Sequence, residues 1–515
     1  MIRLIRNEFL KLHRRHFFLV SFVIVSLALS IYTGVYYFMA DNRTDQDIVE
    51  QQLEKEKAYM AQIESIQWDT ELEMQSAILS SQATIDRLQY MVDHKIAVWD
   101  WRSDVLSRYY TNQNIISLLN AGQDPKDYGF TDSSGSYDSK ATWIQRLTNQ
   151  CDVQMRMVEE NDYMTYSQEQ LGLLQTQYAQ NYSNMSTLDQ VLMDIEIESW
   201  KLYIQYQTPP RAVDQWKSVA IEELANEKEA LARFQYDETY TENMTEEVKS
   251  RQYTWTKRRI RINEFALKND TIPLSVYETM AANANTVTYS SYLLSLKNMM
   301  LVVMAVCVLL SATIMSREFT RGTIRQLLLS PYSRTTIAAS KLITCLCVAA
   351  IFSVLTPVFG MIAGRLLFSN QTIGSSLSTG ALPPYVSNLR NNIIEFPFHT
   401  YIFMNYALEA LKIVVMIVIT LMFSTITESA SGPGLIMLVL SLAGAQIFQA
   451  LYEYIYPAKA LRYLLFGNLN LIQYIQGSWV APYPSAITSI VVIFIVTLLA
   501  LFVYFTNFRY KEISA

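Results

Sequence analysis

The side chains that could carry out chemistry occur in pairs and short runs along the 515-residue chain. Adjacent carboxylates, such as Glu159-Glu160 and Glu222-Glu223, could act as a general acid and base, but acidic helix surfaces carry the same pairs because they are well hydrated. The four cysteines and four histidines are too scattered for a metal site. We therefore predict neither catalytic residues nor metal ligands, and we expect that the chain is not an enzyme.

Two further groups, both in the polar middle of the chain, have a binding interpretation beside a structural one. Trp99 and Trp101 flank Asp100 and could hold a carbohydrate or a lipid, although tryptophan more often packs into a core. The basic run 257–261 could contact anionic headgroups or an anionic cargo, although nearby acids on a helix surface could equally be its partners. We favour the structural interpretation of both groups.

The most distinctive run covers residues 316–334, between two apolar segments. Ile324, Leu327 and Leu328 recur at helical spacing, which predicts a short amphipathic element at a membrane surface. A positively charged anchor would account for the arginines, but not for the spacing of the glutamate, the Gly-Thr pair and the Pro-x-Ser-Arg end. The residues that we expect a soluble partner protein to grip are Glu318, Arg321, Gly322, Thr323, Pro331 and Arg334.

Another pair of charges falls inside an apolar segment. Glu409 and Lys412 are three residues apart, so a helix places them on one face. A charge at the centre of a bilayer costs about 2.5–3.5 kcal/mol, and we therefore expect the two side chains to pair or to line a wet cavity. They are our candidates for a transport pathway, although their place toward the outer end of the segment would also let them reach the headgroups.

The elements that must position these residues are membrane helices. Apolar residues make up 51% of the chain and charged residues 17%, against about a quarter charged in ordinary globular proteins. A membrane span needs about 20 mostly apolar residues. The first such segment is too long for a cleavable signal peptide and lacks a small-residue cleavage site. Six segments qualify as spans: 17–39, 293–315, 342–364, 402–427, 434–452 and 486–505.

Charge gives these spans an orientation. Residues 41–291 hold 40 acidic and 23 basic residues, whereas the rest of the chain holds 7 acidic and 18 basic residues. The basic residues cluster before the first span, between the second and third, and after the last. Since basic loops stay in the cytoplasm, we predict a multi-pass protein of the plasma membrane with both termini cytoplasmic and residues 40–291 outside.

The outward segment is predicted to be helical. No glycine or proline occurs between Gly34 and Gly122, and residues 47–93 could form a single helix of about 70 Å. The fold class is therefore an all-α membrane protein. It comprises an interfacial helix (1–16), one N-terminal span (17–39), a mainly helical extracytoplasmic domain (40–291) and five C-terminal spans (292–515) that include the cytoplasmic loop 316–341.

The loop pattern, from Glu318 through Gly322-Thr323 to Pro331-x-Ser-Arg334 and on to Lys341, resembles the coupling-helix region of ABC type-2 exporter permeases. The basic amphipathic N-terminus also resembles the interfacial helix of that family. The resemblance covers residues 1–40 and about 293–515, and the chain departs from ordinary members by its 250-residue insertion between the first two spans.

The resemblance implies a permease subunit of a bacterial ABC exporter that is driven by a separate ATPase chain. No Gly-x-x-x-x-Gly-Lys-Ser/Thr motif occurs in this chain, so ATP and magnesium are expected in two copies of that partner, and no cofactor in the permease itself. A second permease copy or a sister permease would complete the transporter. The lipid bilayer is a further partner, and we expect no nucleic acid. The alternative is a membrane receptor or secretion scaffold that uses the outward domain to bind partners without ATP.

Overall fold

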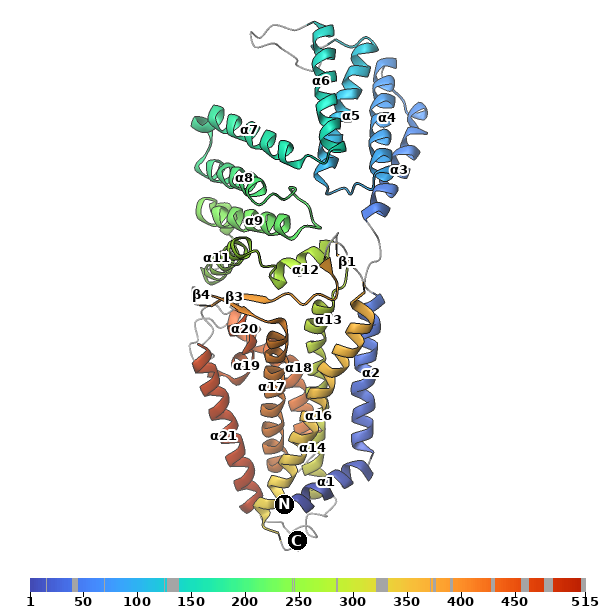
Figure 1. Cartoon of the computed structure of the whole chain (residues 1–515). Helices are drawn as coiled ribbons and strands as arrows, with labels where there is room; N and C mark the ends of the chain where they lie inside the picture. The colour runs from blue at the N-terminus through green and yellow to red at the C-terminus, as the bar shows by residue number, and fades with distance from the viewer. Residues whose placement is uncertain are drawn as a thin grey trace.

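The computed structural model describes residues 1–14, 16–38, 45–68, 70–124, 126, 139–242, 244, 246–283, 286–320, 332–370, 372–373, 377–389, 392–427, 431–454, 463–476 and 485–510. Within these residues the regular structure is helical apart from two short antiparallel hairpins. Figure 1 shows a membrane-type bundle at one end of the molecule and a separate set of helices at the other. We call the second part, residues 45–283, the distal domain.

Five helical segments of the described chain are long and apolar enough to cross a membrane. Large apolar side chains such as Leu366, Phe403 and Phe494 are exposed on their outer faces, which is favourable in lipid but not in water. The chain is therefore built as a multi-pass membrane protein. The segments are α2 (Phe17–Phe38), α13 with α14 (Tyr289–Leu296 and Met300–Thr320), α16 (Arg334–Phe368), α17 (Phe398–Thr427) and α21 (Ala486–Tyr510); α18 (Ser431–Tyr454) is a further apolar helix.

The helices extend beyond the predicted spans, and this corrects the bounds of the predicted loop 316–341. Helix α14 continues to Thr320 and α16 begins at Arg334, so Lys341 lies two turns inside a helix. The side chain of Ser333 accepts a hydrogen bond from the backbone N–H of Thr336 and caps α16 at this early point. Hydropathy alone marks where a helix enters lipid, whereas the cap marks where the helix begins.

Close packing of the bundle depends on small residues in α16. A Cβ atom on Gly364 would lie 2.7 Å from the ring of Tyr292, and one on Gly360 would lie 2.4 Å from Leu296. Both glycines therefore let α13 approach the backbone of α16, as small residues do between membrane helices. Tyr292 also bonds Thr33 of α2, oxygen to oxygen, at 2.7 Å.

In the distal domain the successive helices from α3 to α9 pack against one another, and α10, α11 and α12 each pack against α9. Figure 1 shows one stack of α3 to α6 and a second stack of α7, α8, α9 and α11, which lies crosswise above the bundle. Side chains of Asp100, Ser139, Asp162 and Ser186 accept hydrogen bonds at the starts of α5 to α8, which fixes where each helix begins. The helices are α3 (Asp45–Met60), α4 (Glu71–Asp93), α5 (Trp101–Asn120), α6 (Lys140–Glu159), α7 (Tyr163–Asn181), α8 (Thr187–Gln205), α9 (Trp216–Tyr236), α10 (Glu238–Thr241), α11 (Glu246–Asn269) and α12 (Leu274–Asn283).

The proposed unbroken helix over residues 47–93 is wrong. Helix α3 ends at Met60, the 3-10 turn η1 (Ile63–Ser65) follows, and α4 begins at Glu71. The indole nitrogen of Trp68 donates to the carbonyl of Ile63 at 2.8 Å, and Thr70 and Glu73 form a reciprocal capping box. These local bonds redirect the chain without any glycine or proline.

Two hairpins that the sequence did not predict lie between the distal domain and the bundle (Figure 1). The backbone N–H of Leu274 in α12 donates to Pro384 at 2.8 Å, and that of Tyr289 donates to Thr379 at 2.9 Å. The distal domain is thereby bonded to the segment that joins α16 to α17. The strands are β1 (Thr372–Ile373) with β2 (Leu377–Ser378) and β3 (Tyr385–Leu389) with β4 (Asn392–Phe396), and the short helices α19 (Leu465–Asn468) and α20 (Ile472–Ile475) lie at the same end of the bundle.

Candidate functional site

Of the six predicted partner-binding residues, four lie outside the described residues: Arg321, Gly322, Thr323 and Pro331. Glu318 lies in the last turn of α14, and Arg334 is the first residue of α16. Figure 1 shows that these helix ends lie at the end of the bundle that also holds α1 (Ile2–Arg14) and the end of α21. We call this end the base.

Arg334 joins two helices at the base. Its guanidinium donates to the backbone carbonyl of Arg509 in the last turn of α21 at 3.1 Å. One helical turn further along α16, the hydroxyl of Tyr504 donates to the carbonyl of Ala338 at 2.9 Å, and this contact is buried. The C-terminal end of α21 is therefore bonded to α16, which begins at Arg334, the last of the predicted partner-binding residues.

A buried ion pair fixes α1 to the same helix. The ammonium of Lys341 lies 3.4 Å from Oε2 of Glu8, and the two side chains are 0% and 8% exposed. Oε1 of Glu8 accepts from Lys11 at 2.9 Å. Because a buried charge is tolerated only when it is paired, this pair holds α1 and α16 in one relative position.

The contact between Glu8 and Lys341 was not predicted from the sequence, in which Glu8 falls in the expected interfacial helix (1–16) and Lys341 at the end of the expected loop 316–341. A signal was present: Glu8 is the only acidic residue before Asp41, in a segment otherwise rich in arginine and lysine. A lone acid among bases at a membrane surface indicates a specific partner. The sequence did not show which lysine that partner would be.

Within the bundle, Glu409 and Lys412 are paired as expected from their spacing. The ammonium of Lys412 donates to Glu409 at 2.7 Å, and the side chains are 20% and 23% exposed. Lys297, at the start of the 3-10 turn η4 (Lys297–Met299) between α13 and α14, lies within electrostatic range of both charges. The three residues form one charged group between the second and fourth apolar segments.

A largely apolar cavity of about 430 Å³ lies between α13, α16 and α17 and is open toward the outer face of the bundle, where Val354 and Phe403 of its lining are 61% and 73% exposed. Pro357 forms part of its wall and interrupts the hydrogen bonding inside α16. Tyr406 also lines the cavity, and its hydroxyl is bonded to the carbonyl of Leu293 at 3.0 Å. The cavity is suited to an apolar chain rather than to an ion.

Within the basic run 257–261, Arg259 pairs with nearby acids, as the structural interpretation of the run expects. This guanidinium lies 2.9 Å from Glu227 and 3.7 Å from Glu223, both on α9. Burial raises the pKa of Glu227, and the positive charge of Arg259 opposes that shift. At this position the run is an internal connection between α9 and α11.

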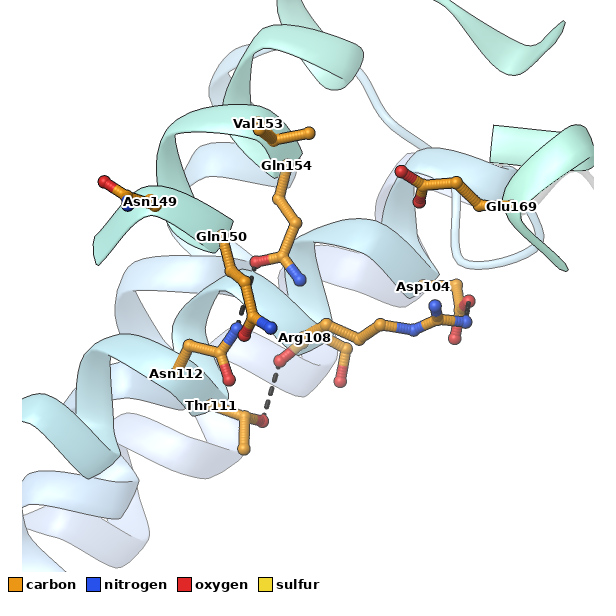
Figure 2. Close-up of a pocket in the computed structure, with 10 residues that line it drawn as sticks. Asp104, Arg108, Thr111, Asn112, Asn149, Gln150, Val153, Gln154 and Glu169 are labelled. Atoms are coloured by element: carbon orange, nitrogen blue, oxygen red, sulfur yellow. Dashed lines mark hydrogen bonds and ion pairs between the residues drawn. The ribbon is translucent and has the colours of Figure 1, made fainter. Parts of the chain in front are cut away.

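The distal domain contains two adjoining clefts. The larger, of about 680 Å³, lies between α5, α6 and α7 and is lined mainly by amide and charged side chains (Figure 2). The smaller, of about 430 Å³, has aromatic walls and shares Asp104 and Ser107 with the larger. Trp101 is buried in the core, as favoured from the sequence, whereas the half-buried Trp99 lines the smaller cleft.

Comparison with known proteins gives a match for the C-terminal part of the chain. Residues 260–514 match the family described as "Protein of unknown function (DUF2705)". A 215-residue stretch is 23% identical to the "Uncharacterized protein YhcI" of Bacillus subtilis (strain 168), and the alignment covers 40% of this chain. The chain spans 63% of the length of that relative. No solved structure matches this chain.

Proposed function

We propose that this protein is the membrane-spanning permease subunit of a bacterial ABC exporter. In this proposal α18 is the sixth span, both termini are cytoplasmic, and residues 40–291 are outside the cell. The observation that carries it is the pattern from Glu318 to Arg334, which joins α14 to α16 at a base where α1 and α21 are also attached. Such a base offers a soluble partner one surface from which several membrane helices can be moved.

The energy source in this proposal is a separate pair of ATPase chains, which bind ATP and magnesium. Force on residues 318–334 would reach α14 and α16 directly. It would also reach α1 through the Glu8–Lys341 pair and α21 through the Arg334–Arg509 contact. A second permease chain, either identical or related, would complete the pathway.

The charged group of Lys297, Glu409 and Lys412 is the proposed polar part of that pathway. Charged side chains inside membrane segments commonly mark the routes of ions or substrates. The neighbouring apolar cavity would receive the apolar part of a cargo. Cargo with both characters is therefore the class that the bundle suits best.

Co-purification and ATP hydrolysis test the proposal. We expect an ATPase encoded beside this chain to purify with it and to hydrolyse ATP faster in its presence. Glu318→Ala and Arg334→Ala should each reduce this stimulation several-fold. Arg3→Ala, which removes an exposed charge of α1 at the same end, is the control and should have little effect. If no ATPase purifies with the chain, or if both variants keep full stimulation, the proposal is wrong.

The second candidate is a membrane receptor or secretion scaffold that uses no ATP. The adjoining clefts of the distal domain favour it, because they offer a binding surface far from the base. If the distal domain of this protein binds an external ligand and no ATPase associates with the chain, the second candidate is favoured over the first.

A further inference from the structure

The junction of the two distal clefts contains a carboxylate with a fixed orientation. Oδ2 of Asp104 accepts from the hydroxyl of Tyr166 at 2.6 Å and from the guanidinium of Arg108 at 2.6 Å. Oδ1 of the same carboxylate has no hydrogen-bond partner in the described part of the chain. Although its side chain is 46% exposed, the aspartate is thus oriented before a ligand arrives, which lowers the ordering cost of binding a hydroxyl group.

The larger cleft adds a row of amides to this acceptor. Asn112 of α5 donates to Gln154 of α6 at 3.2 Å (Figure 2). Asn149 and Gln150 also line the cleft, and among the described residues their side chains make no hydrogen bond or ion pair. Since an amide both donates and accepts, this wall matches ligand groups that do the same, such as hydroxyl and acetamido groups.

The smaller cleft provides an aromatic wall. Trp101, Tyr166 and Trp200 form a buried chain, with ring centroids 5.2 Å and 5.8 Å apart, and the half-buried Trp99 lies at the same cleft. These three rings are only 5–6% exposed, so Trp99 is the ring of this group that offers a flat apolar face to a ligand, at little cost in entropy. The C–H face of a sugar ring is a suitable partner for such a surface.

The charges around the clefts select against acidic ligands. Four carboxylates line them, from Asp100, Asp104, Glu169 and Glu222, against the guanidinium groups of Arg108 and Arg211, and Arg102 pairs with Asp100 at 2.6 Å, which leaves a net charge of minus one. An anionic ligand would meet net repulsion. We propose that the joined clefts bind a neutral saccharide chain, with one sugar ring against the face of Trp99 and the next hydroxyl and acetamido groups on Asp104 and the amides. This proposal does not depend on ATP coupling.

Binding is tested on the full-length protein in lipid nanodiscs by titration calorimetry with the tetrasaccharide of N-acetylglucosamine. We expect saturable one-to-one binding. Trp99→Ala should weaken it at least tenfold, and Asp104→Asn should do the same while preserving the shape of the side chain. Tyr166→Phe, which removes only the hydroxyl that orients Asp104, should weaken it about three- to tenfold, whereas Gln175→Leu, an exposed change on the far part of α7, should leave it unchanged.

A hyaluronan tetrasaccharide provides the charged comparison, because it also contains N-acetylglucosamine but carries carboxylates. The proposal expects it to bind at least tenfold more weakly. Equal or tighter binding of hyaluronan, no binding of the neutral tetrasaccharide, or binding that none of the cleft variants weakens would each overturn the proposal. Circular dichroism of each variant separates loss of the site from loss of the fold.

Discussion

The base of the bundle and the exposed faces of the distal domain use charged residues in opposite ways. At the base, Glu8 and Lys341 form a pair whose side chains are 8% and 0% exposed. In the distal domain, pairs such as Glu54–Lys57 and Asp104–Arg108 have side chains that are 41–75% exposed. The Glu8–Lys341 pair is enclosed by packed helices, whereas the two distal pairs remain in contact with water. One ion pair therefore contributes very differently to stability in the two places.

The difference follows from the cost of removing a charge from water. An exposed ion pair contributes about 0–1 kcal/mol, whereas breaking a buried pair costs about 3–5 kcal/mol because one charge is left without its partner. Away from the internal pairs of Arg259 with Glu223 and Glu227, the helices of the distal domain must therefore be fixed by their caps and apolar contacts. The relative positions of the helices at the base depend in part on a few polar contacts, and each of these contributes more to stability than an exposed pair.

The largest effect is expected for Glu8→Ala. This change leaves the ammonium of Lys341 buried without its carboxylate, and we expect a loss of about 3–5 kcal/mol in the free energy of unfolding. Thermal unfolding of the full-length protein in detergent measures it, with Glu54→Ala, which breaks an exposed pair, as the control.

The double variant Glu8→Met, Lys341→Met distinguishes a charge effect from a packing effect. Both side chains become apolar and of similar length, so most of the lost stability should return. If Glu8→Ala is as stable as the wild type, the buried pair at the base contributes no more to stability than the exposed pairs of the distal domain.

A smaller effect is expected in the distal domain for Thr70→Ala. The hydroxyl of Thr70 accepts from the backbone N–H of Glu73 at 3.2 Å and completes the capping box at the start of α4. Its loss should cost about 1 kcal/mol. Gln75→Ala, at an exposed position of the same helix, is the control and should change stability by less than about 0.5 kcal/mol. Equal losses in the two variants would show that the cap is not what defines the helix start.

The smallest effect concerns Glu278, at the boundary between the two regions. Burial raises the pKa of Glu278, although hydroxyl groups of Thr288 and Ser290 donate to it and oppose the shift. A raised folded-state pKa stabilises the protein below the ordinary pKa of glutamate, and this contribution is lost as the pH rises through the folded-state value. Between about pH 4 and pH 7 the wild type should therefore lose stability relative to Glu278→Gln.

Melting temperatures of both proteins across that pH range provide the measurement. The difference in melting temperature should grow toward neutral pH in favour of the glutamine variant. A constant difference would mean that Glu278 titrates alike in the folded and unfolded chain.

The apolar segments were predictable because hydrophobicity acts over whole helices. The predicted span 17–39 corresponds to α2. The predicted start of the last span, residue 486, is the first residue of α21, and the predicted end of the fourth span, residue 427, is the last residue of α17. The break between α3 and α4 was not predictable by the same means. It depends on single bonds made by Trp68 and Thr70, which composition and periodicity do not reveal.

The candidate site was predictable only where its partners are close in sequence. Glu409 and Lys412 are paired three residues apart on one helix, and their contact followed from helical geometry. Glu8 and Lys341 are 333 residues apart, and the larger distal cleft brings together residues from three helices. Contacts of this kind require the packing of the folded chain, which no local pattern contains.

The length of α16 has a mechanical consequence. Its 35 residues form a rod of about 50 Å, which runs from the base to the hairpins that are bonded to α12 and α13 (Figure 1). If its Arg334 end pivots by about five degrees, the Phe368 end swings by about 4 Å at this rise per residue, more than the length of a hydrogen bond. Pro357 is the one proline in α16. The stiffness of the helix at this residue decides how much of the movement at Arg334 is transmitted to Phe368.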